Sequence, residues 1–183
     1  MRKRADQVAQ TRERIVEAAV HLHGTVGPAA TTVAGIAAVA GVTRLTVYRH
    51  FPDEEAIFAA CSAHWLSRQV PPNPIAWAQV ADPAERLRVG LTDLYQFYRD
   101  GREMLTHVYG DMAVLPDTHR RTLEDRQELF HTLLAEPFPA NQRIRAVIGH
   151  AISFWTWRSL CLDNGLSNAE AVELMSALAD LGR

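Results

Sequence analysis

The sequence predicts an all-α protein of about nine helices, and three observations support this fold class. Apolar residues recur at helical spacing along most of the 183-residue chain. No run of strictly alternating apolar and polar residues, as expected of a strand, lies between turn signals. Capping residues and helix breakers follow one another at helix-length intervals. With 48% hydrophobic residues, the chain can bury the core of one domain or of a small module plus a larger one.

The first four helices are predicted from local capping and breaking signals. The first ends where glycine and proline follow one another in residues 24–28. Thr32 and Thr43 offer hydroxyl caps to the second and third helices, and Gly41 separates these two helices. Asp53 caps the fourth, because its carboxylate can accept bonds from free backbone N–H groups. The expected ranges are 7–23, 33–40, 43–50 and 53–68.

The later helices are predicted in the same way. The proline-rich residues 70–74 cannot form a regular helix, and the next helix begins at Pro83 behind an Asp82 cap. Ser167 and Glu170 form a capping box at the start of the last helix. The expected ranges are 83–100, 103–112, 117–136, 142–162 and 168–181.

The charges are distributed unevenly along the chain. Residues 1–50 carry seven basic and three acidic side chains, whereas the other 133 residues carry 12 and 18. A basic N-terminal segment on an acidic body suggests a polyanionic partner for that segment alone. No apolar stretch is long enough for a membrane span, and none follows the basic start as in a signal peptide. The expectation is therefore a cytoplasmic protein without a membrane partner.

The residues offer little to catalysis or to metal binding. The two cysteines match neither a disulfide framework nor a metal-binding pattern. The eight histidines are scattered without ligand spacing. The phosphate-binding Gly-x-x-x-x-Gly-Lys pattern and the nucleophile pattern Gly-x-Ser-x-Gly are both absent. The sequence therefore predicts no catalytic residue, no metal and no cofactor, and an enzyme is the least favoured class.

The most informative segment is residues 31–52, where two short predicted helices flank a tight glycine turn. This is the arrangement of a DNA-binding helix-turn-helix. Small and branched apolar residues can close a core between the two helices: Ile36, Ala37, Ala40, Val42 and Val47. The outer face of the second helix then mixes cations, hydroxyls, an aromatic ring and an imidazole. These groups suit base edges and phosphates in a major groove, whereas a purely structural helix pair would usually carry Glu and Lys there.

Several short segments resemble the N-terminal domain of tetracycline-repressor-like (TetR) transcriptional regulators. The resemblance covers roughly residues 10–60. The segments that carry it are Ala18-Ala19 through Gly27, Thr31-Thr32-Val33, Ile36-Ala37, Ala40-Gly41-Val42 and Thr46-Val47-Tyr48-Arg49-His50-Phe51-Pro52. The resemblance implies a three-helix DNA-binding domain over residues 1–52. It also implies a larger helical domain for ligand binding and dimerisation over residues 53–183.

The resemblance also assigns roles in binding double-stranded operator DNA. Arg44, Leu45 and Tyr48 would face the bases, with Arg44 suited to guanine and Leu45 to a thymine methyl. The residues that would face the phosphate backbone are Thr32, Thr43, Thr46, Arg49 and His50. Arg2, Lys3 and Arg4 would form a flexible basic arm.

Three positions depart from the pattern of many relatives. Leu45 stands where a small residue is usual, which predicts an operator sequence particular to this protein and its close kin. Glu54 replaces a phosphate-binding lysine and would repel DNA unless its side chain points away. His23 stands where an aromatic residue, usually phenylalanine, packs.

The last two predicted helices carry more apolar surface than one domain core requires, which predicts a homodimer through a four-helix interface. The predicted interface residues are Ile144, Ile148, Ile152, Trp155, Ala171, Leu174, Leu178 and Leu181. Aromatic, methionine and polar residues of the middle helices could also line a cavity for a small, largely apolar or aromatic effector. The candidate lining residues are Trp65, Tyr95, Tyr98, Met104, His107, Met112, Phe130 and Phe154.

The sequence thus favours a homodimeric repressor that a small effector releases from a palindromic operator. The alternative is a dimeric DNA-binding module without effector control, whose C-terminal part only dimerises. A change of operator affinity on ligand binding distinguishes the two.

Overall fold

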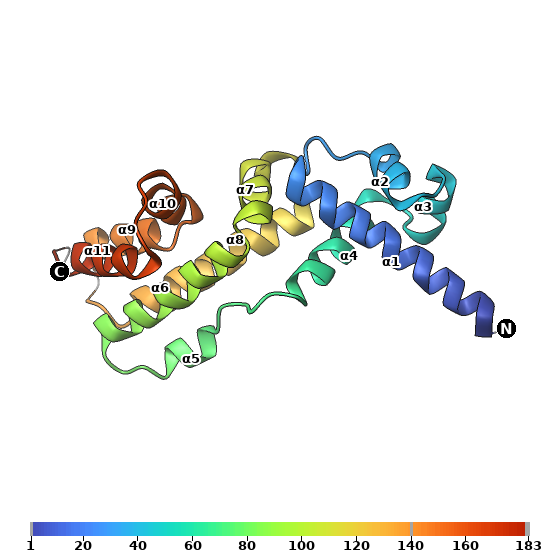
Figure 1. The fold of residues 1–183 in the computed structure, drawn as a ribbon. Coiled ribbons are helices and arrows are strands. Elements are labelled where there is room, and N and C mark those ends of the chain that lie inside the picture. The colour runs from blue at the N-terminus through green and yellow to red at the C-terminus, as the bar shows by residue number, and fades with distance from the viewer. Residues whose placement is uncertain (1, 140, 182–183) are drawn as a thin grey trace. The chain divides into compact units, whose positions relative to one another are not determined.

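The computed structural model describes residues 2–139 and 141–181, apart from the side chains of Arg2 and Lys3, and these residues form helices and no strand (Figure 1). The α-helices are α1 (Arg2–Thr25), α2 (Val33–Ala40), α3 (Arg44–His50), α4 (Glu54–Leu66), α5 (Pro74–Ala78), α6 (Pro83–Asp100), α7 (Arg102–Gly110), α8 (Asp117–Ala135), α9 (Gln142–Ala151), α10 (Phe154–Arg158) and α11 (Asn168–Leu181). The other two helical elements are a 3-10 turn, η1 (Met112–Val114), and a π-helical turn, η2 (Ser159–Asp163). No helix in these ranges is long and apolar enough to cross a membrane.

The chain forms two compact units, each built from two separate segments. The first comprises the residues up to Val70 together with Arg102–Arg121, and the second comprises Pro71–Gly101 together with the residues from Thr122 onward. The first unit therefore extends past residue 52, the predicted end of the DNA-binding domain, because α4, α7 and the start of α8 belong to it.

The core of the first unit lies around α1, which packs against α2, α4 and α7. Ile15 and Ala19 recur at helical spacing on the buried face of α1 and are fully buried. Val47 and Phe51 close the same core from α3 and the residue after it. This packing fixes which face of α3 remains at the surface.

The loop between α1 and α2 is held by the residue that follows α7. Gly27 has a left-handed φ of +88°, and a Cβ atom there would lie 2.6 Å from Oδ2 of Asp111. The backbone N–H of Ala29 donates a hydrogen bond to the same oxygen, with a donor–acceptor distance of 2.8 Å. Asp111 thus fixes the position of the loop that leads into α2.

Replacing Asp111 by alanine removes this bond and should lower the free energy of unfolding by about 1 kcal/mol. Urea unfolding followed by circular dichroism measures the change. Asp125→Ala, which removes an exposed carboxylate from α8, should cost less than about 0.5 kcal/mol. Equal midpoints for the two variants would show that the loop does not depend on Asp111.

The second unit is organised around α6, whose buried face is the stripe that its helical spacing predicts. Leu87, Leu91 and Leu94 on this face are all at most 1% exposed, and α11 and α5 pack on the helix. Gly90 allows Leu134 of α8 to approach, because a Cβ atom at residue 90 would lie 2.7 Å from its Cδ2.

Three elements differ from the sequence-based prediction. The helix expected over 142–162 is broken, because α9 ends at Ala151 and Ser153 caps α10. The side-chain hydroxyls of Tyr95 and Tyr98 donate hydrogen bonds of 2.8 Å to the carbonyl oxygens of Ala151 and Ile152, which satisfies backbone groups at the break.

The other two differences lie in α5 and α1. Asn73 and Pro74 start the short helix α5 at the edge of the stretch expected to be irregular. Helix α1 begins at Arg2, so the residues expected to form a flexible arm are helical, although the side chains of Arg2 and Lys3 lie outside the described part. With α5 and α10 added, the described residues contain eleven α-helices, where about nine were expected.

Candidate nucleic-acid interface

The helices α2 and α3 form the predicted helix-turn-helix, and local hydrogen bonds set its ends. Thr32 caps α2, and its Oγ1 accepts a bond of 3.0 Å from the backbone N–H of Gly35. Gly41 ends α2 in a left-handed conformation with φ +64°, which L-residues with a Cβ adopt at a cost. Thr43 then caps α3 by accepting a bond of 3.2 Å from the N–H of Thr46. The turn is therefore specified by its own residues.

The packing of α3 leaves most of the predicted DNA-binding side chains at the surface. Val47 is fully buried against α1 and α2, whereas Leu45 is 76% exposed and Tyr48 is 43% exposed. Arg44 and Arg49 are exposed as well. Thr32 and Thr43 are exposed at the two caps, whereas Thr46 and His50 are half-buried. The predicted residues of α3 thus form one polar face that also carries an apolar side chain.

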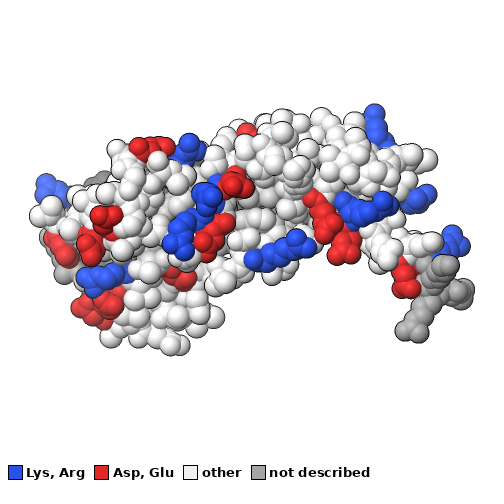
Figure 2. Space-filling view, viewed as in Figure 1, with Lys and Arg blue, Asp and Glu red and all other residues white. Residues whose placement is uncertain are grey.

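Two arginines of α1, which sequence reasoning counted only as charge, lie beside this helix pair. The guanidinium of Arg12 stacks over the ring of Phe51 at 4.8 Å from its centroid, and Nη1 of Arg14 lies near the turn at Gly41. Figure 2 shows basic side chains over the region of α1–α3, with acidic side chains among them. Burial lowers the pKa of His50, and the charges of Arg49 and Arg12 lower it further. His50 is therefore an uncharged hydrogen-bonding group at neutral pH.

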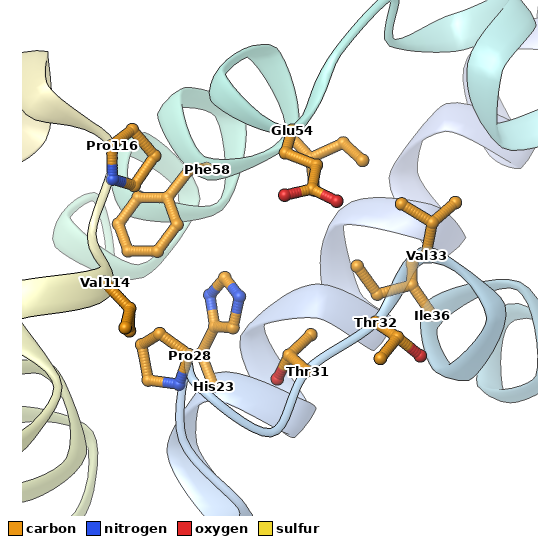
Figure 3. A pocket seen from close by; sticks show the side chains of 11 residues that line it. His23, Pro28, Thr31, Thr32, Val33, Ile36, Glu54, Phe58, Val114 and Pro116 are labelled. Carbon is orange, nitrogen blue, oxygen red and sulfur yellow. The ribbon is translucent and has the colours of Figure 1, made fainter.

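Glu54, the acidic residue where many TetR-like regulators carry a lysine, points into a small cavity (Figure 3). The cavity measures about 80 Å³ and belongs to the first unit. His23 lines the same cavity and is 5% exposed. Its ring packs on Phe58 with centroids 4.8 Å apart, and its Nδ1 lies 3.3 Å from Sγ of Cys61. His23 thus occupies a core position, as expected of an aromatic residue there.

This buried histidine should make the protein sensitive to acid. Burial lowers the pKa of His23 from 6.5 to about 4. Between these pH values the unfolded chain binds a proton that the folded chain does not, so stability should fall as the pH falls. Urea unfolding of wild type and His23→Phe over this range measures the effect, because phenylalanine keeps the ring but binds no proton. The wild type should lose stability more steeply; parallel curves would contradict this prediction.

The predicted dimer residues divide into a buried and an exposed set. Ile144, Ile148, Ile152 and Ala171 are at most 1% exposed within this chain, so their place in the predicted interface was wrong: they belong to the core of the second unit. The exposed fractions are 46% for Trp155, 47% for Leu174, 38% for Leu178 and 85% for Leu181. Only this second set is available to a partner.

The predicted effector-binding residues also fall into two groups. Trp65, Met104, His107 and Met112 belong to the first unit, and Tyr95, Tyr98, Phe130 and Phe154 belong to the second.

In the second unit, Tyr98 and Phe154 pack edge to face at 5.4 Å, and Phe130 packs on Trp77 at 5.0 Å. These rings and Tyr95 are buried core residues rather than the walls of an open pocket. In the first unit, Nδ1 of His107 lies beside the Gly27 turn, 3.2 Å from where a Cβ would stand. The cavity of the first unit is lined by none of the eight predicted residues.

No group of three or more His, Cys, Asp or Glu side chains in the described ranges is arranged to hold a metal ion. Helix α3 is exposed like the recognition helix of a helix-turn-helix, and arginines lie on it and beside it. The fold and the site thus define a helix-turn-helix protein.

Comparisons with known proteins show which helix-turn-helix proteins the chain is similar to. Residues 15–61 match the sequence model described as "Bacterial regulatory proteins, tetR family". Residues 15–61, which contain α2 and α3, are thus similar to the DNA-binding part of TetR family regulators.

Two curated relatives are uncharacterized HTH-type transcriptional regulators from two strains of Mycobacterium tuberculosis. Each is 35% identical over 91 residues, which cover 48% of this chain and 44% of the relative. The match thus spans less than half the length of these relatives.

Solved structures resemble the whole fold. A TetR-like transcriptional regulator from Rhodococcus sp. RHA1 matches with a TM-score of 0.65 and 21% identity, over 94% of either chain. The TetR family regulator PfmR from Thermus thermophilus matches with a TM-score of 0.61 and 24% identity, over 92% of this chain and 96% of that chain. At these identities the likeness concerns the fold, an N-terminal helix-turn-helix followed by a larger helical part.

Proposed function

We propose that the chain is a transcriptional repressor that binds double-stranded operator DNA through α3. The observation that carries this proposal is the exposed face of α3, on which Arg44, Leu45 and Tyr48 stand together while Val47 anchors the helix. Arg44 can form two parallel hydrogen bonds to guanine, and Leu45 can contact a thymine methyl group. Arg49 and the α1 arginines can approach phosphates, which favours DNA over an uncharged partner.

The repressor acts as a homodimer. The partner that we propose for the exposed apolar face of α11 is a second copy of the chain. Leu174, Leu178 and Leu181 recur at helical spacing on α11 and are exposed, whereas Ala171 and Met175 cover the chain's own core. Apolar residues on two faces of α11 are expected of a helix that packs on its own chain with one face and on a partner with the other. Two copies related by a two-fold axis would present two α3 helices to the half-sites of a palindromic operator.

Footprinting of the full chain on the DNA upstream of its own gene tests the proposal. The expected result is protection of a palindrome whose half-sites lie about one turn of DNA, or a multiple of it, apart. Competing DNA of unrelated sequence distinguishes specific from charge-driven binding. If unrelated DNA abolishes the protection as effectively as DNA that carries the palindrome, the chain has no specific operator there.

Effector control is the second part of the proposal: a small, largely apolar or aromatic molecule binds the larger helical part and weakens operator binding. A tenfold loss of DNA affinity requires about 1.4 kcal/mol of coupling, and DNA must weaken the ligand by the same factor. Thermal-shift screening followed by operator titration with and without each hit tests this part. Hits that stabilise the protein and leave operator affinity unchanged would contradict it.

One observation favours the alternative, a dimeric DNA-binding module without effector control. Tyr95, Tyr98 and Phe154 fill the core of the second unit, and both tyrosine hydroxyls already donate to backbone carbonyl groups. A ligand would have to displace these rings. The same titration separates the two functions.

A further inference from the structure

The cavity in the first unit has a mixed lining that suits a small polar ligand. It lies where the end of α1, the loop before α2, the start of α4 and the residues around η1 meet (Figure 3). Phe58, Val114 and Pro116 form apolar walls, and the polar side chains include His23 and Glu54. Its volume of about 80 Å³ is well below the roughly 300 Å³ at which pockets for drug-sized ligands begin. A molecule of a few non-hydrogen atoms fits.

The polar side chains of the lining differ in whether they already have a hydrogen-bond partner. Thr32 is engaged as the cap of α2, and the hydroxyl of Thr31 donates to the carbonyl oxygen of Gly27 at 2.8 Å. The described residues give the carboxylate of Glu54 no hydrogen bond or ion pair. His23 uses Nδ1 toward Cys61, and Nε2 is the other nitrogen of a ring that points into the cavity (Figure 3).

The electrostatics of the cavity favour a cation. No lysine or arginine lines it. Of the three acidic residues at the start of α4, Asp53 caps the N–H of Ala56, and Glu55 accepts a bond from Thr118. Glu54, which is exposed to solvent, is the one of the three that lines the cavity. Burial keeps His23 uncharged at neutral pH, because its pKa is lowered to about 4, so His23 does not offset the negative charge.

We infer that this cavity binds a short primary alkylammonium ion. The ammonium group donates hydrogen bonds to the carboxylate of Glu54, and the ring of Phe58 lines the same cavity. The alkyl part lies against Val114 and Pro116. A larger molecule would not fit the cavity, and the carboxylate of Glu54 would repel an anionic one. No residue of α3 lines this site, whereas Thr32, a predicted phosphate contact, does.

NMR titration of the ¹⁵N-labelled full chain with ethylammonium chloride, without DNA, tests the inference. Sodium chloride at the same ionic strength is the reference, because it supplies cations that cannot use the apolar walls. Saturable shifts of amides in residues 23–36 and 54–58 are expected, with a Kd in the millimolar range for so small a ligand. Titration without saturation, or equal shifts with sodium, would overturn the inference.

Three variants locate the binding. Glu54→Gln should weaken ethylammonium about tenfold, since it removes the charge but keeps the shape. Glu13→Gln makes the same charge change on an exposed part of α1 and should leave the Kd unchanged. Val114→Phe fills the cavity from an exposed position and should abolish binding while Glu54 stays charged. Equal affinity in wild type and Glu54→Gln, or in wild type and Val114→Phe, would refute the site. Loss of DNA binding would not affect this experiment.

Discussion

The Arg44→Ala variant is expected to bind its operator about 5- to 150-fold more weakly than wild type, which corresponds to about 1–3 kcal/mol. The reason is the position of Arg44 in the first turn of α3, exposed and beyond the capping residue Thr43. A guanidinium there can bond both acceptors of a guanine, and alanine can bond neither. Fluorescence anisotropy with labelled operator at fixed salt measures the loss. The variant should also tolerate base changes at one position of each half-site.

Arg49→Ala is the matched comparison, because it also removes one positive charge, from the other end of α3. If Arg49 contacts phosphate, affinity for all sequences should fall together, and the dependence of binding on salt should become less steep. If both variants bind the operator as tightly as wild type does, α3 is not the recognition helix.

The double variant Leu174→Glu, Leu178→Glu should be monomeric at micromolar concentration and should lose at least about a hundredfold in operator affinity. Both leucines are exposed on the same face of α11, so charges there should oppose pairing without disturbing the chain's own core. A monomer can contact only one half-site and loses the advantage of simultaneous binding. Analytical ultracentrifugation and the anisotropy assay measure the two effects.

The control adds the same two charges elsewhere, as Val70→Glu with Ile75→Glu. These residues are 82% and 75% exposed and lie outside α10 and α11. This variant should remain dimeric and bind DNA as wild type does. A 20.4 kDa species for the wild type, or an intact dimer of the α11 variant, would contradict the proposed interface.

The helix-turn-helix could be predicted closely from the sequence because its ends depend on local chemistry. Thr32, Gly41 and Thr43 act on backbone groups within a few residues of themselves. The observed α2 begins after Thr32 and ends before Gly41, and α3 begins after Thr43. The exposed face of α3 followed in turn, because assigning Val47 to the core leaves the other residues outside. Here the pattern of residues carries most of the structural information.

The differences between the sequence-based prediction and the structure arise from tertiary contacts. The helical spacing of apolar residues carries no information about these contacts. The apolar stripe of Ile144, Ile148 and Ile152 does not reveal whether its own chain or a partner covers it, and its own chain does. The break before Ser153 lies inside an apolar run, and its carbonyl groups are satisfied by tyrosines from α6. Likewise, the aromatic content of the middle helices did not distinguish a filled core from a pocket. The cavity near His23 is formed by segments far apart in the sequence.

Arg44 is proposed to contact a specific base pair from the exposed face of α3, and a double-mutant cycle tests this contact most directly. Operator affinity would be measured for wild type and Arg44→Ala on the native operator and on one with the contacted guanine replaced. If the contact exists, the base change should weaken wild type by about 1–3 kcal/mol and hardly affect Arg44→Ala. If the two losses simply add at every base pair of the half-site, Arg44 contacts none of these bases, and the assignment of the recognition surface is contradicted.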